Sequence, residues 1–232
     1  MIANLYGGGG VEAVLFDMDG LLVDTEPLWY EVETEVVERL GGTWGRAHQE
    51  RLVGGSMRST VAYILEVTGA DVPPETVAGW MLEGMRSRLA RGVELMPGAD
   101  ELLTEVRDAG LRTGLVTSSG RVLADAVLGT IGAGRFDVVV TGDDVARHKP
   151  DPEPYLRAAR LLGLPPGRCV ALEDSPNGVA AATAAGCAVV AVPSVLPVEE
   201  APGRLVVGSL KELSVERLRA LFPDPEPPSR IP

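Results

Sequence analysis

The sequence reads VLFDMDG at residues 14–20, so that Asp17 and Asp19 follow directly on a short apolar run. A run of this kind, bounded by a glycine turn, predicts a buried strand that ends in a loop. The acidic pair alone is a weak indication of a site, because carboxylates on surface loops and helix caps are common. Its meaning depends on which other polar segments the fold brings beside it.

Two further polar segments occur later in the chain. Thr117 and Ser118 come after residues 111–116, and their hydroxyls and turn amides suit either phosphate oxygens or the cap of a helix beginning near Arg121. Lys149 precedes a proline in a loop, where a cation is either ordinary surface charge or the partner of a phosphoryl group and an ionised aspartate. Neither segment decides between these roles alone.

A second acidic segment follows the apolar run at residues 170–172. Glu173 and Asp174 stand there just before a predicted helix, and such carboxylates either bind magnesium or cap the helix. Because ligands of open parallel sheets bind at the carboxyl ends of the strands, we expect these residues to meet Asp17 and Asp19 at one edge of a sheet.

The fold class follows from six short apolar runs rich in branched residues, which alternate with helical patterns such as residues 99–109 and 152–162. Repeated strand and helix predict a parallel sheet covered on both faces, an α/β fold of Rossmann-like type. The predicted strands are residues 11–16, 111–116, 136–140, 169–172, 188–192 and 205–207.

Residues 24–96 interrupt this alternation with helical periods and no convincing strand. Thr25 is expected to cap a first helix with Pro27 in its first turn, and further helices are predicted at 59–68 and 74–91. The pattern predicts a helical bundle inserted after the first strand. The expected parts are a catalytic α/β core at 11–24 and 95–222, an inserted helical domain at 25–94, and flexible termini at 1–10 and 223–232.

Composition disfavours several classes of function. The net charge of -12 argues against nucleic-acid binding, because phosphate backbones require clustered Lys and Arg. No apolar run approaches the roughly 18 residues of a membrane span. Cys169 and Cys187 lie in apolar stretches without metal-site spacing, so we expect buried, reduced thiols and a cytoplasmic protein. His48 and His148 have no visible partner and are expected at the surface.

Taken together, the four polar segments resemble the motifs of the haloacid dehalogenase superfamily, which are Asp-x-Asp-Gly, Thr/Ser, Lys and Glu-Asp. The resemblance covers nearly all of residues 11–220 and extends to FDMDGLLVDTEPL at 16–28 and EDSPNG at 173–178. These stretches are similar to the subgroup whose helical cap is inserted after the first motif. That subgroup includes sugar phosphatases and β-phosphoglucomutase.

The resemblance implies a mechanism for this chain. Asp17 is the implied nucleophile, which attacks phosphorus to give an aspartyl-phosphate. Asp19 is the implied acid and base, which protonates the leaving ester oxygen and then deprotonates the attacking water. Thr117 and the Ser118 amide are expected to bind phosphate oxygens, while Lys149 offsets the crowded negative charge.

The resemblance also implies a Mg²⁺ cofactor. Its ligands would be Asp17, Asp174 and the backbone carbonyl of Asp19, with Glu173 as a direct or water-mediated ligand, an oxygen-rich set that suits a hard cation. An acidic protein could then bind an anionic substrate, because one metal ion, one lysine and directed amides make a locally positive site.

Two other reactions of the superfamily are disfavoured by the residues present. Dehalogenases of the superfamily lack a second carboxylate at the position of Asp19, because their leaving group is not an oxygen that needs a proton. Phosphonate cleavage in related enzymes uses a cap lysine, whereas residues 24–96 contain no lysine.

The expected cap residues bear on the acceptor of the phosphoryl group. Arg58 ends a GSMR stretch that resembles the Gly-x-x-Arg loop with which mutases hold a distal phosphate or sugar, although a solvent-facing arginine fits equally well. Glu26 and Trp29 stand near the hinge as candidate substrate contacts, with a core position as the alternative for Trp29. Mutases of the subgroup carry a histidine in the place of Trp29, and some sugar phosphatases share its Glu-Pro-Leu-Trp stretch.

We therefore expect a Mg²⁺-dependent phosphatase for a small phosphorylated metabolite such as a sugar phosphate. It is expected to act as a monomer or weak dimer, with no nucleic-acid or membrane partner. The alternatives are a β-phosphoglucomutase-like sugar phosphomutase and a catalytically idle phosphate-binding module. Hexose, pentose, nucleoside and polyol phosphates and phosphoglycolate are all candidate substrates.

Overall fold

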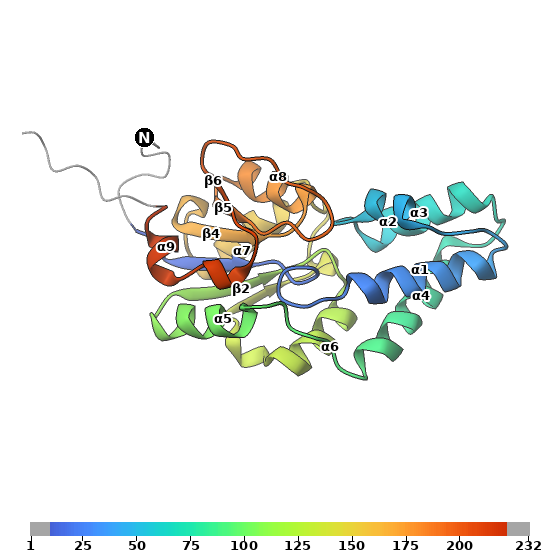
Figure 1. Cartoon of the computed structure of the whole chain (residues 1–232), viewed down its shortest axis with the longest axis horizontal. Coiled ribbons are helices and arrows are strands. Elements are labelled where there is room, and N and C mark those ends of the chain that lie inside the picture. The colour runs from blue at the N-terminus through green and yellow to red at the C-terminus, as the bar shows by residue number, and fades with distance from the viewer. Residues whose placement is uncertain (1–9, 222–232) are drawn as a thin grey trace, which may run out of the picture.

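The computed structural model of the 232-residue chain describes residues 10–221. Figure 1 shows two parts, a sheet covered by helices on both faces and a group of helices that extends beyond one end of it. The termini expected to be flexible, residues 1–10 and 223–232, lie outside the described residues apart from Gly10.

Six parallel strands form the sheet in the order β3-β2-β1-β4-β5-β6. β1 lies at the centre between β2 and β4 and is buried along its whole length, which accounts for its unbroken apolar sequence. Each predicted run coincides with one strand to within two residues at either end, so the α/β prediction is confirmed. The strands are β1 (Ala13–Phe16), β2 (Arg112–Val116), β3 (Val138–Val140), β4 (Cys169–Glu173), β5 (Ala188–Ala191) and β6 (Arg204–Val206).

The register aligns the carboxyl ends of the three central strands. Phe16 on β1 lies opposite Leu115 on β2 and Leu172 on β4. The next residue, Asp17, therefore leaves the sheet beside Glu173, and its N–H still donates to the carbonyl of Leu172 at 3.0 Å. Polar residues that follow these strands consequently meet at one edge of the sheet.

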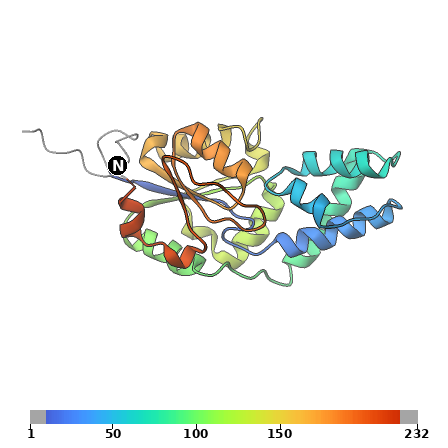
Figure 2. The same cartoon turned by 45° about the horizontal axis from the view of Figure 1, so that its top comes forward.

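Alternate side chains of β1 pack against helices on opposite faces of the sheet. Val14 and Phe16 belong to an apolar cluster with α5, α6 and α9, whereas Ala13 and Leu15 belong to a second cluster with α7 and α8. Figure 2 shows these two helical layers on either side of the strands. The helices are α5 (Ala99–Asp108), α6 (Arg121–Ile131), α7 (Glu153–Leu162), α8 (Pro176–Ala185) and α9 (Val215–Arg219).

Four helices lie between β1 and β2 in the chain, and we call them the helical insertion. Helices α1 and α3 both pack against α4, and their apolar stripes join the same cluster as one face of the sheet. Among residues 10–221, no helix is both long and apolar enough to cross a membrane. The four helices are α1 (Glu26–Arg39), α2 (Arg46–Leu52), α3 (Met57–Thr68) and α4 (Pro74–Leu89).

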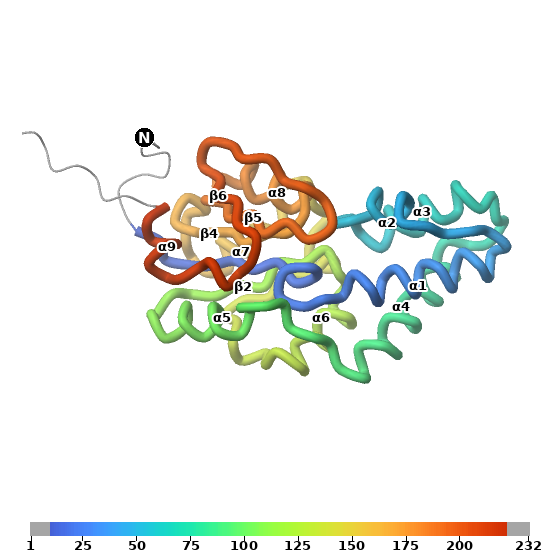
Figure 3. Tube along the Cα trace, viewed as in Figure 1, coloured from blue at the N-terminus to red at the C-terminus, as the bar shows by residue number. Residues whose placement is uncertain are grey.

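The two chain connections to the insertion run together. Val23 and Leu95 form an antiparallel bridge, and the N–H of Asp24 donates to the carbonyl of Glu94 at 2.9 Å. Figure 3 traces the chain out into α1 and back from α4 toward α5. The chain therefore leaves the core and rejoins it at neighbouring points, close to the loop that carries the acidic pair.

Two local features of the insertion differ from the sequence expectation. The Thr25 side chain makes no capping hydrogen bond to α1, because its hydroxyl donates to Asp19 Oδ1 at 2.7 Å instead. Helix α2 is not foreseen in the sequence, since its seven residues include none that is buried and so show no apolar stripe.

Candidate active site

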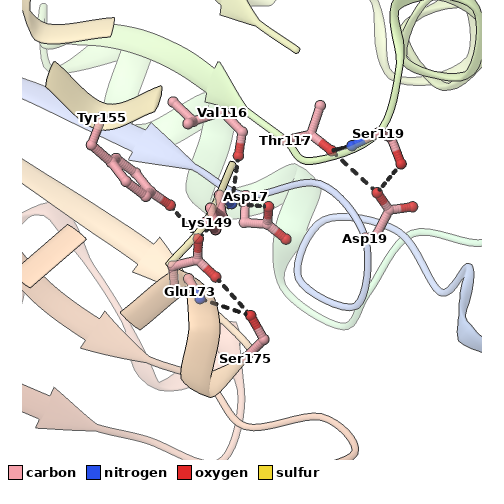
Figure 4. Close-up of polar contacts among 10 residues, drawn as sticks. Asp17, Asp19, Val116, Thr117, Ser119, Lys149, Tyr155, Glu173 and Ser175 are labelled. Atoms are coloured by element: carbon pink, nitrogen blue, oxygen red, sulfur yellow. Dashed lines mark hydrogen bonds and ion pairs between the residues drawn. The ribbon is translucent and has the colours of Figure 1, made fainter. Parts of the chain in front are cut away.

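Lys149 lies at the centre of a buried cluster of polar groups. Its Nζ donates to Asp17 Oδ1 at 2.6 Å, to Glu173 Oε1 at 2.6 Å and to the carbonyl of Val116 at 2.9 Å (Figure 4). Burial lowers the pKa of the ammonium group, but Asp17 and Glu173 outweigh this and raise the pKa above its ordinary value. Lys149 is therefore a permanent cation beside the predicted nucleophile.

Glu173 is fixed by partners on both of its oxygens. Tyr155 from α7 and Lys149 donate to Oε1, and the Ser175 hydroxyl donates to Oε2 at 3.5 Å. Tyr155 is fully buried, and burial next to Glu173 raises the pKa of its phenol well above the ordinary value, so it stays a neutral donor. No signal in the sequence marks Tyr155, because an aromatic residue on a helix facing the sheet is expected in any core.

Three buried carboxylates converge at the end of the sheet. Asp17, Glu173 and Asp174 each offer an oxygen, and these oxygens all lie within 4.8 Å of one another. Burial raises the pKa of Asp17 well above its usual value, an effect that Lys149 partly offsets and the neighbouring acids reinforce. Burial and then the charge of Glu173 raise the pKa of Asp174 to about 8.

The donor set at this edge fits a divalent cation. If all three carboxylates were ionised, the single ammonium would leave two negative charges uncompensated in a buried space, which is costly unless a cation neutralises them. Oxygen donors are those that Mg²⁺ prefers. Because both Glu173 oxygens already have partners, Asp17 and Asp174 are the carboxylates best placed to bind the ion directly.

Gly20 allows the first acidic loop to pass close to the second. Its φ is +77°, a left-handed conformation that favours glycine, and a Cβ there would lie 2.3 Å from Asp174 Oδ2. Asp174 is held from its other side by the Ser194 hydroxyl, which donates to Oδ2 at 2.6 Å. The Asp-x-Asp-Gly sequence thus has a steric reason as well as a chemical one.

Asp19 is anchored by hydroxyl groups from two loops. Thr25 donates to Oδ1, while Ser119 and Thr117 donate to Oδ2 at 2.8 and 3.2 Å. Asp19 is only partly buried and lines the same cavity as Asp17. The two carboxylates of the pair therefore have different surroundings, since one is paired with Lys149 and the other only with neutral donors.

The loop after β2 presents a free hydroxyl to the cavity. Thr117 is buried, and its Oγ1 accepts from the Ser119 N–H at 3.0 Å while donating to Asp19. The Ser118 Oγ lines the cavity, is shielded from solvent and has no hydrogen-bond partner among residues 10–221. An anion placed here would satisfy the Ser118 hydroxyl, whereas the Thr117 hydroxyl already has partners.

The helical insertion forms the opposite wall of the cavity. Glu26 and Trp29, the candidate substrate contacts, line it, and Trp29 also packs against the apolar core. Arg58 is exposed and does not line the cavity. Glu33 and Gln49 also line the cavity, and sequence reasoning did not identify them. Glu33 could have been found from its spacing, because it stands seven residues after Glu26 and so lies on the same face of α1.

Glu33 is held by an aromatic cluster within the insertion. Trp44 Nε1 donates to Glu33 Oε2 at 3.1 Å, and the Trp44 ring stacks on His48 with centroids 4.7 Å apart. His48 Nδ1 lies 2.8 Å from the hydroxyl of Tyr63, so His48 has partners and is half-buried, contrary to the expectation of a free surface residue. His148 is also half-buried, and its Nδ1 has no partner among the described residues.

We predict that Glu33 makes the protein less stable as the pH rises from about 4.5 to about 7. Burial raises the pKa of Glu33 from 4.5 to about 7, so the folded state binds more protons than the unfolded state across this window. The free energy of unfolding should fall by on the order of 2 kcal/mol across this pH range. Urea unfolding at pH 5 and pH 8 should show a smaller pH effect in Glu33→Gln than in the parent.

Glu50→Gln serves as the matched control for this measurement, because Glu50 is exposed on α2. It should keep the parent's pH dependence. If Glu33→Gln and Glu50→Gln showed the same pH dependence of stability, Glu33 would not be its source.

The fold and the site define an α/β protein with a cluster of buried carboxylates at the carboxyl edge of a parallel sheet. Residues 14–192 match the haloacid dehalogenase-like hydrolase family. The chain belongs to this family. Since named phosphatases are among its relatives, it is a phosphatase-type enzyme.

Known relatives cover most of the chain. Hexitol phosphatase A of Escherichia coli is 37% identical over 186 residues, which are 77% of this chain and 81% of the relative. Fructose-1-phosphate phosphatase YqaB of the same organism is 34% identical over 174 residues, or 75% and 92% of the two chains. The crystal structure of a CbbY variant from Rhodobacter sphaeroides in complex with xylulose-(1,5)bisphosphate is similar with a TM-score of 0.80 and 32% identity, covering 88% of this chain and 96% of that one.

Proposed function

We propose that the chain is a Mg²⁺-dependent phosphatase that hydrolyses a small phosphorylated metabolite of the sugar-phosphate kind through a phosphorylated Asp17. The observation that carries the proposal is the pairing of Asp17 with Lys149, beside Asp174 and within the same cavity as Asp19. This arrangement supplies a buried nucleophile with a compensating cation and, separately, a carboxylate free to exchange a proton. The phosphatase relatives support the same reaction.

The proposed first step transfers the phosphoryl group to the enzyme. Phosphate oxygens bind at the Ser118 hydroxyl, at the loop amides and toward Lys149, which orients phosphorus in line with Asp17. An Asp17 oxygen forms a bond to phosphorus as the ester bond breaks. Asp19 gives its proton to the leaving oxygen, so the metabolite departs as a neutral alcohol.

The proposed second step releases phosphate. Asp19 accepts a proton from water, whose oxygen attacks phosphorus while the bond to Asp17 breaks. The hydroxyls of Thr25, Thr117 and Ser119 hold Asp19 in one orientation for both proton transfers. These hydroxyls are positioning groups, because they act through Asp19.

Mg²⁺ would be held by Asp17 and Asp174, with the Asp19 backbone carbonyl as the further ligand that the family resemblance implies. When bound, it supplies positive charge that stabilises the phosphoryl oxygens in the transition state. Glu173 keeps Lys149 and Tyr155 in place around this ligand set.

Two features of the insertion favour water over a sugar as the phosphoryl acceptor. Trp29 lines the cavity where mutases of the subgroup carry a histidine, and no described histidine lines it. Arg58, the candidate for holding a distal phosphate, is exposed. A sugar phosphomutase is the second candidate, and an idle phosphate-binding module is a third that the complete set of motif residues disfavours.

We further propose that residues 25–94 act as a cap over the core formed by 11–24 and 95–222. The cavity between the insertion and the strand ends, lined from both sides, supports this division. The two buried, unpaired cysteines fit the reducing setting of the cytoplasm. We propose a monomer or weak dimer as the active form.

The test of the function is phosphate release from a panel of phosphorylated metabolites. We expect turnover of at least one sugar or polyol monophosphate with Mg²⁺, and a loss of at least about 10³-fold with excess EDTA, restored by added Mg²⁺. Faster formation of an isomeric sugar phosphate than of free phosphate would instead establish the mutase. Binding without turnover of any compound would establish the idle module.

We predict that Mg²⁺ binding raises the unfolding temperature of the free enzyme. At about 100 times its dissociation constant, the ion should add about 5 to 10 °C, because it neutralises the clustered carboxylates only in the folded state. Asp174→Asn should remove most of this shift in a thermal denaturation experiment. Asp71→Asn, which changes an exposed residue of the insertion, should keep it.

A further inference from the structure

The wall of the cavity formed by the insertion is acidic and neutral rather than basic. Glu26, Trp29 and Glu33 stand on one face of α1, three and four residues apart, and all three line the cavity. Gln49 from α2 lines it beside them. We call these four residues the acidic wall.

Lys149 is the one basic side chain that lines the cavity within residues 10–221. Its ammonium group is already shared between Asp17 and Glu173 at the core end. Beyond the position of the transferred phosphoryl group, no described cation therefore faces the substrate. A second phosphate on the metabolite would have nothing to pair with.

Three arginines of the insertion have partners that do not line the cavity. Arg88 pairs with Glu31 and Glu35 at 3.0 and 2.7 Å. The guanidinium groups of Arg39 and Arg51 lie over the rings of Trp80 and Tyr63. These side chains would have to leave existing partners before they could reach the cavity.

Glu33 presents to the cavity a carboxyl oxygen that lacks a donor within residues 10–221. Its side chain is buried, with 4% of the residue exposed, yet only Oε2 has a partner, the Trp44 N–H. No described residue donates a hydrogen bond to Oε1, although Glu33 lines the cavity. Because Oε1 is not shielded within the protein, it is open to the cavity, where a hydroxyl group of a ligand could donate to it.

Glu26 adds a second acceptor in the same wall. Gln49 Nε2 donates to the Glu26 carbonyl at 3.0 Å and lies 3.4 Å from Oε2, which brings the amide and the carboxyl group together. Burial raises the pKa of Glu26 to about 7, as it does for Glu33. Near neutral pH both carboxyls can accept from hydroxyls or, when protonated, donate to them.

We propose that the acidic wall is a specificity site that binds the hydroxyls of an uncharged leaving group and rejects a substrate carrying a second phosphate. Trp29 offers an aromatic face for the C–H surface of a sugar or polyol, while Glu26, Glu33 and Gln49 bind its hydroxyls. Rejection follows from placing two acidic groups where the second phosphate would lie. The proposal rests on the phosphatase function proposed above.

The fold itself does not impose this selectivity. The similar CbbY structure holds xylulose-(1,5)bisphosphate, so a chain of the same architecture can accept two phosphates. Under the proposal, selectivity is set by side chains of the cavity wall, which here include Glu26 and Glu33, and Lys149 is the one base among the described lining residues.

The test compares fructose 1-phosphate with fructose 1,6-bisphosphate, measuring kcat/KM for phosphate release. We expect the parent enzyme to favour the monophosphate by at least about 100-fold. In the double variant Glu26→Gln Glu33→Gln this preference should fall at least tenfold, through a lower KM for the bisphosphate and a higher KM for the monophosphate. An unchanged preference would overturn the proposal.

The matched control is Glu31→Gln Glu35→Gln, which removes the same charge from the outer face of the same helix. It should leave the preference at the parent value. A fall equal to that of the wall variant would show that net charge, and not the wall, sets the selectivity, and the proposal would be wrong. A parent enzyme that hydrolyses the bisphosphate as well as the monophosphate, and loses only the bisphosphate activity in Arg58→Ala, would also overturn it.

Trp44→Phe tests how Glu33 is held, without altering the wall itself. An aromatic ring that can stack on His48 is kept, but the N–H bond to Glu33 is lost. As a positioning residue, Trp44 should affect the KM of fructose 1-phosphate by about threefold to tenfold while kcat changes less. An equal loss of kcat with unchanged KM would argue against this role.

An aryl phosphate separates failure of this inference from failure of the proposed function. If p-nitrophenyl phosphate and both sugar phosphates go unhydrolysed with Mg²⁺, the phosphatase proposal itself fails. If the aryl phosphate is hydrolysed but the two fructose phosphates are not distinguished, only the specificity site fails.

Discussion

Asp17→Asn should abolish phosphate release, with a loss in kcat/KM of at least about 10⁴-fold. An amide has nearly the same shape as the carboxylate but is a far weaker nucleophile, and it cannot form the aspartyl-phosphate. The neutral amide would also weaken the charge pairing that Lys149 makes with this position at 2.6 Å. Steady-state assays on the best metabolite of the panel provide the measurement.

Two controls make this result specific to the nucleophile. Asp24→Asn removes an exposed acid close to the same loop and should retain nearly full activity. Asp19→Asn should lose about 10² to 10⁴-fold, but should still become phosphorylated by an aryl phosphate, whose leaving group needs no proton. Mass spectrometry after acid quenching should find the added phosphoryl group on Asp17. Turnover of Asp17→Asn at the parent rate would rule out the mechanism.

The sheet could be predicted because its physical cause is local in the sequence. Buried parallel strands must be apolar on both faces, so residues such as Val14 and Leu15 stand in unbroken runs between helical patterns. Helix α2 could not be predicted, since its existence depends on the surrounding insertion rather than on an apolar stripe. The hydroxyl of Thr25 was assigned to a helix cap because the competing partner, Asp19, is brought near only by the loop.

The core of the site could be predicted for a topological reason. Once strands are parallel and in register, residues that follow them meet at one edge, as Asp17, Lys149 and Glu173 do. Supporting residues carry no such signal. Tyr155 lies within a helix, and Ser194 lies in a loop whose path the sequence does not specify.

The substrate side of the cavity was the least predictable part. Glu33 would ordinarily be assigned to the solvent face of an amphipathic helix. Its spacing from Glu26 places both on one face of α1, but its burial and its hydrogen bond from Trp44 are seen only in the structure. Arg58 illustrates the reverse case, because a motif suggested a substrate contact and the structure places the side chain in solvent. Charge selection by a cavity wall can therefore be recognised only from the three-dimensional arrangement of its side chains.

Lys149→Met should unfold at a temperature lower by about 10 °C, corresponding to a loss of about 3 to 5 kcal/mol. The substitution keeps an unbranched chain of similar length but leaves Asp17 and Glu173 buried without their shared cation. Phosphate release should fall at least about 10²-fold as well, because Lys149 no longer offsets charge beside the phosphoryl group. Thermal denaturation and the same phosphatase assay measure the two effects.

The pH dependence of this loss identifies its cause. The pKa of Lys149 is raised, so its own charge is constant from about pH 5 to about pH 9, and any change in the loss must come from the carboxyl groups. Burial raises the pKa of Asp17, so without the ammonium Asp17 can become neutral by binding a proton, and the destabilisation should be smaller at pH 5 than at pH 8. Lys149→Met Glu173→Gln should regain much of the stability, since one buried carboxylate is gone, while activity stays low. If the double variant unfolds at the same temperature as Lys149→Met, charge compensation is not the source of the stability, and the lysine must be assigned to catalysis alone.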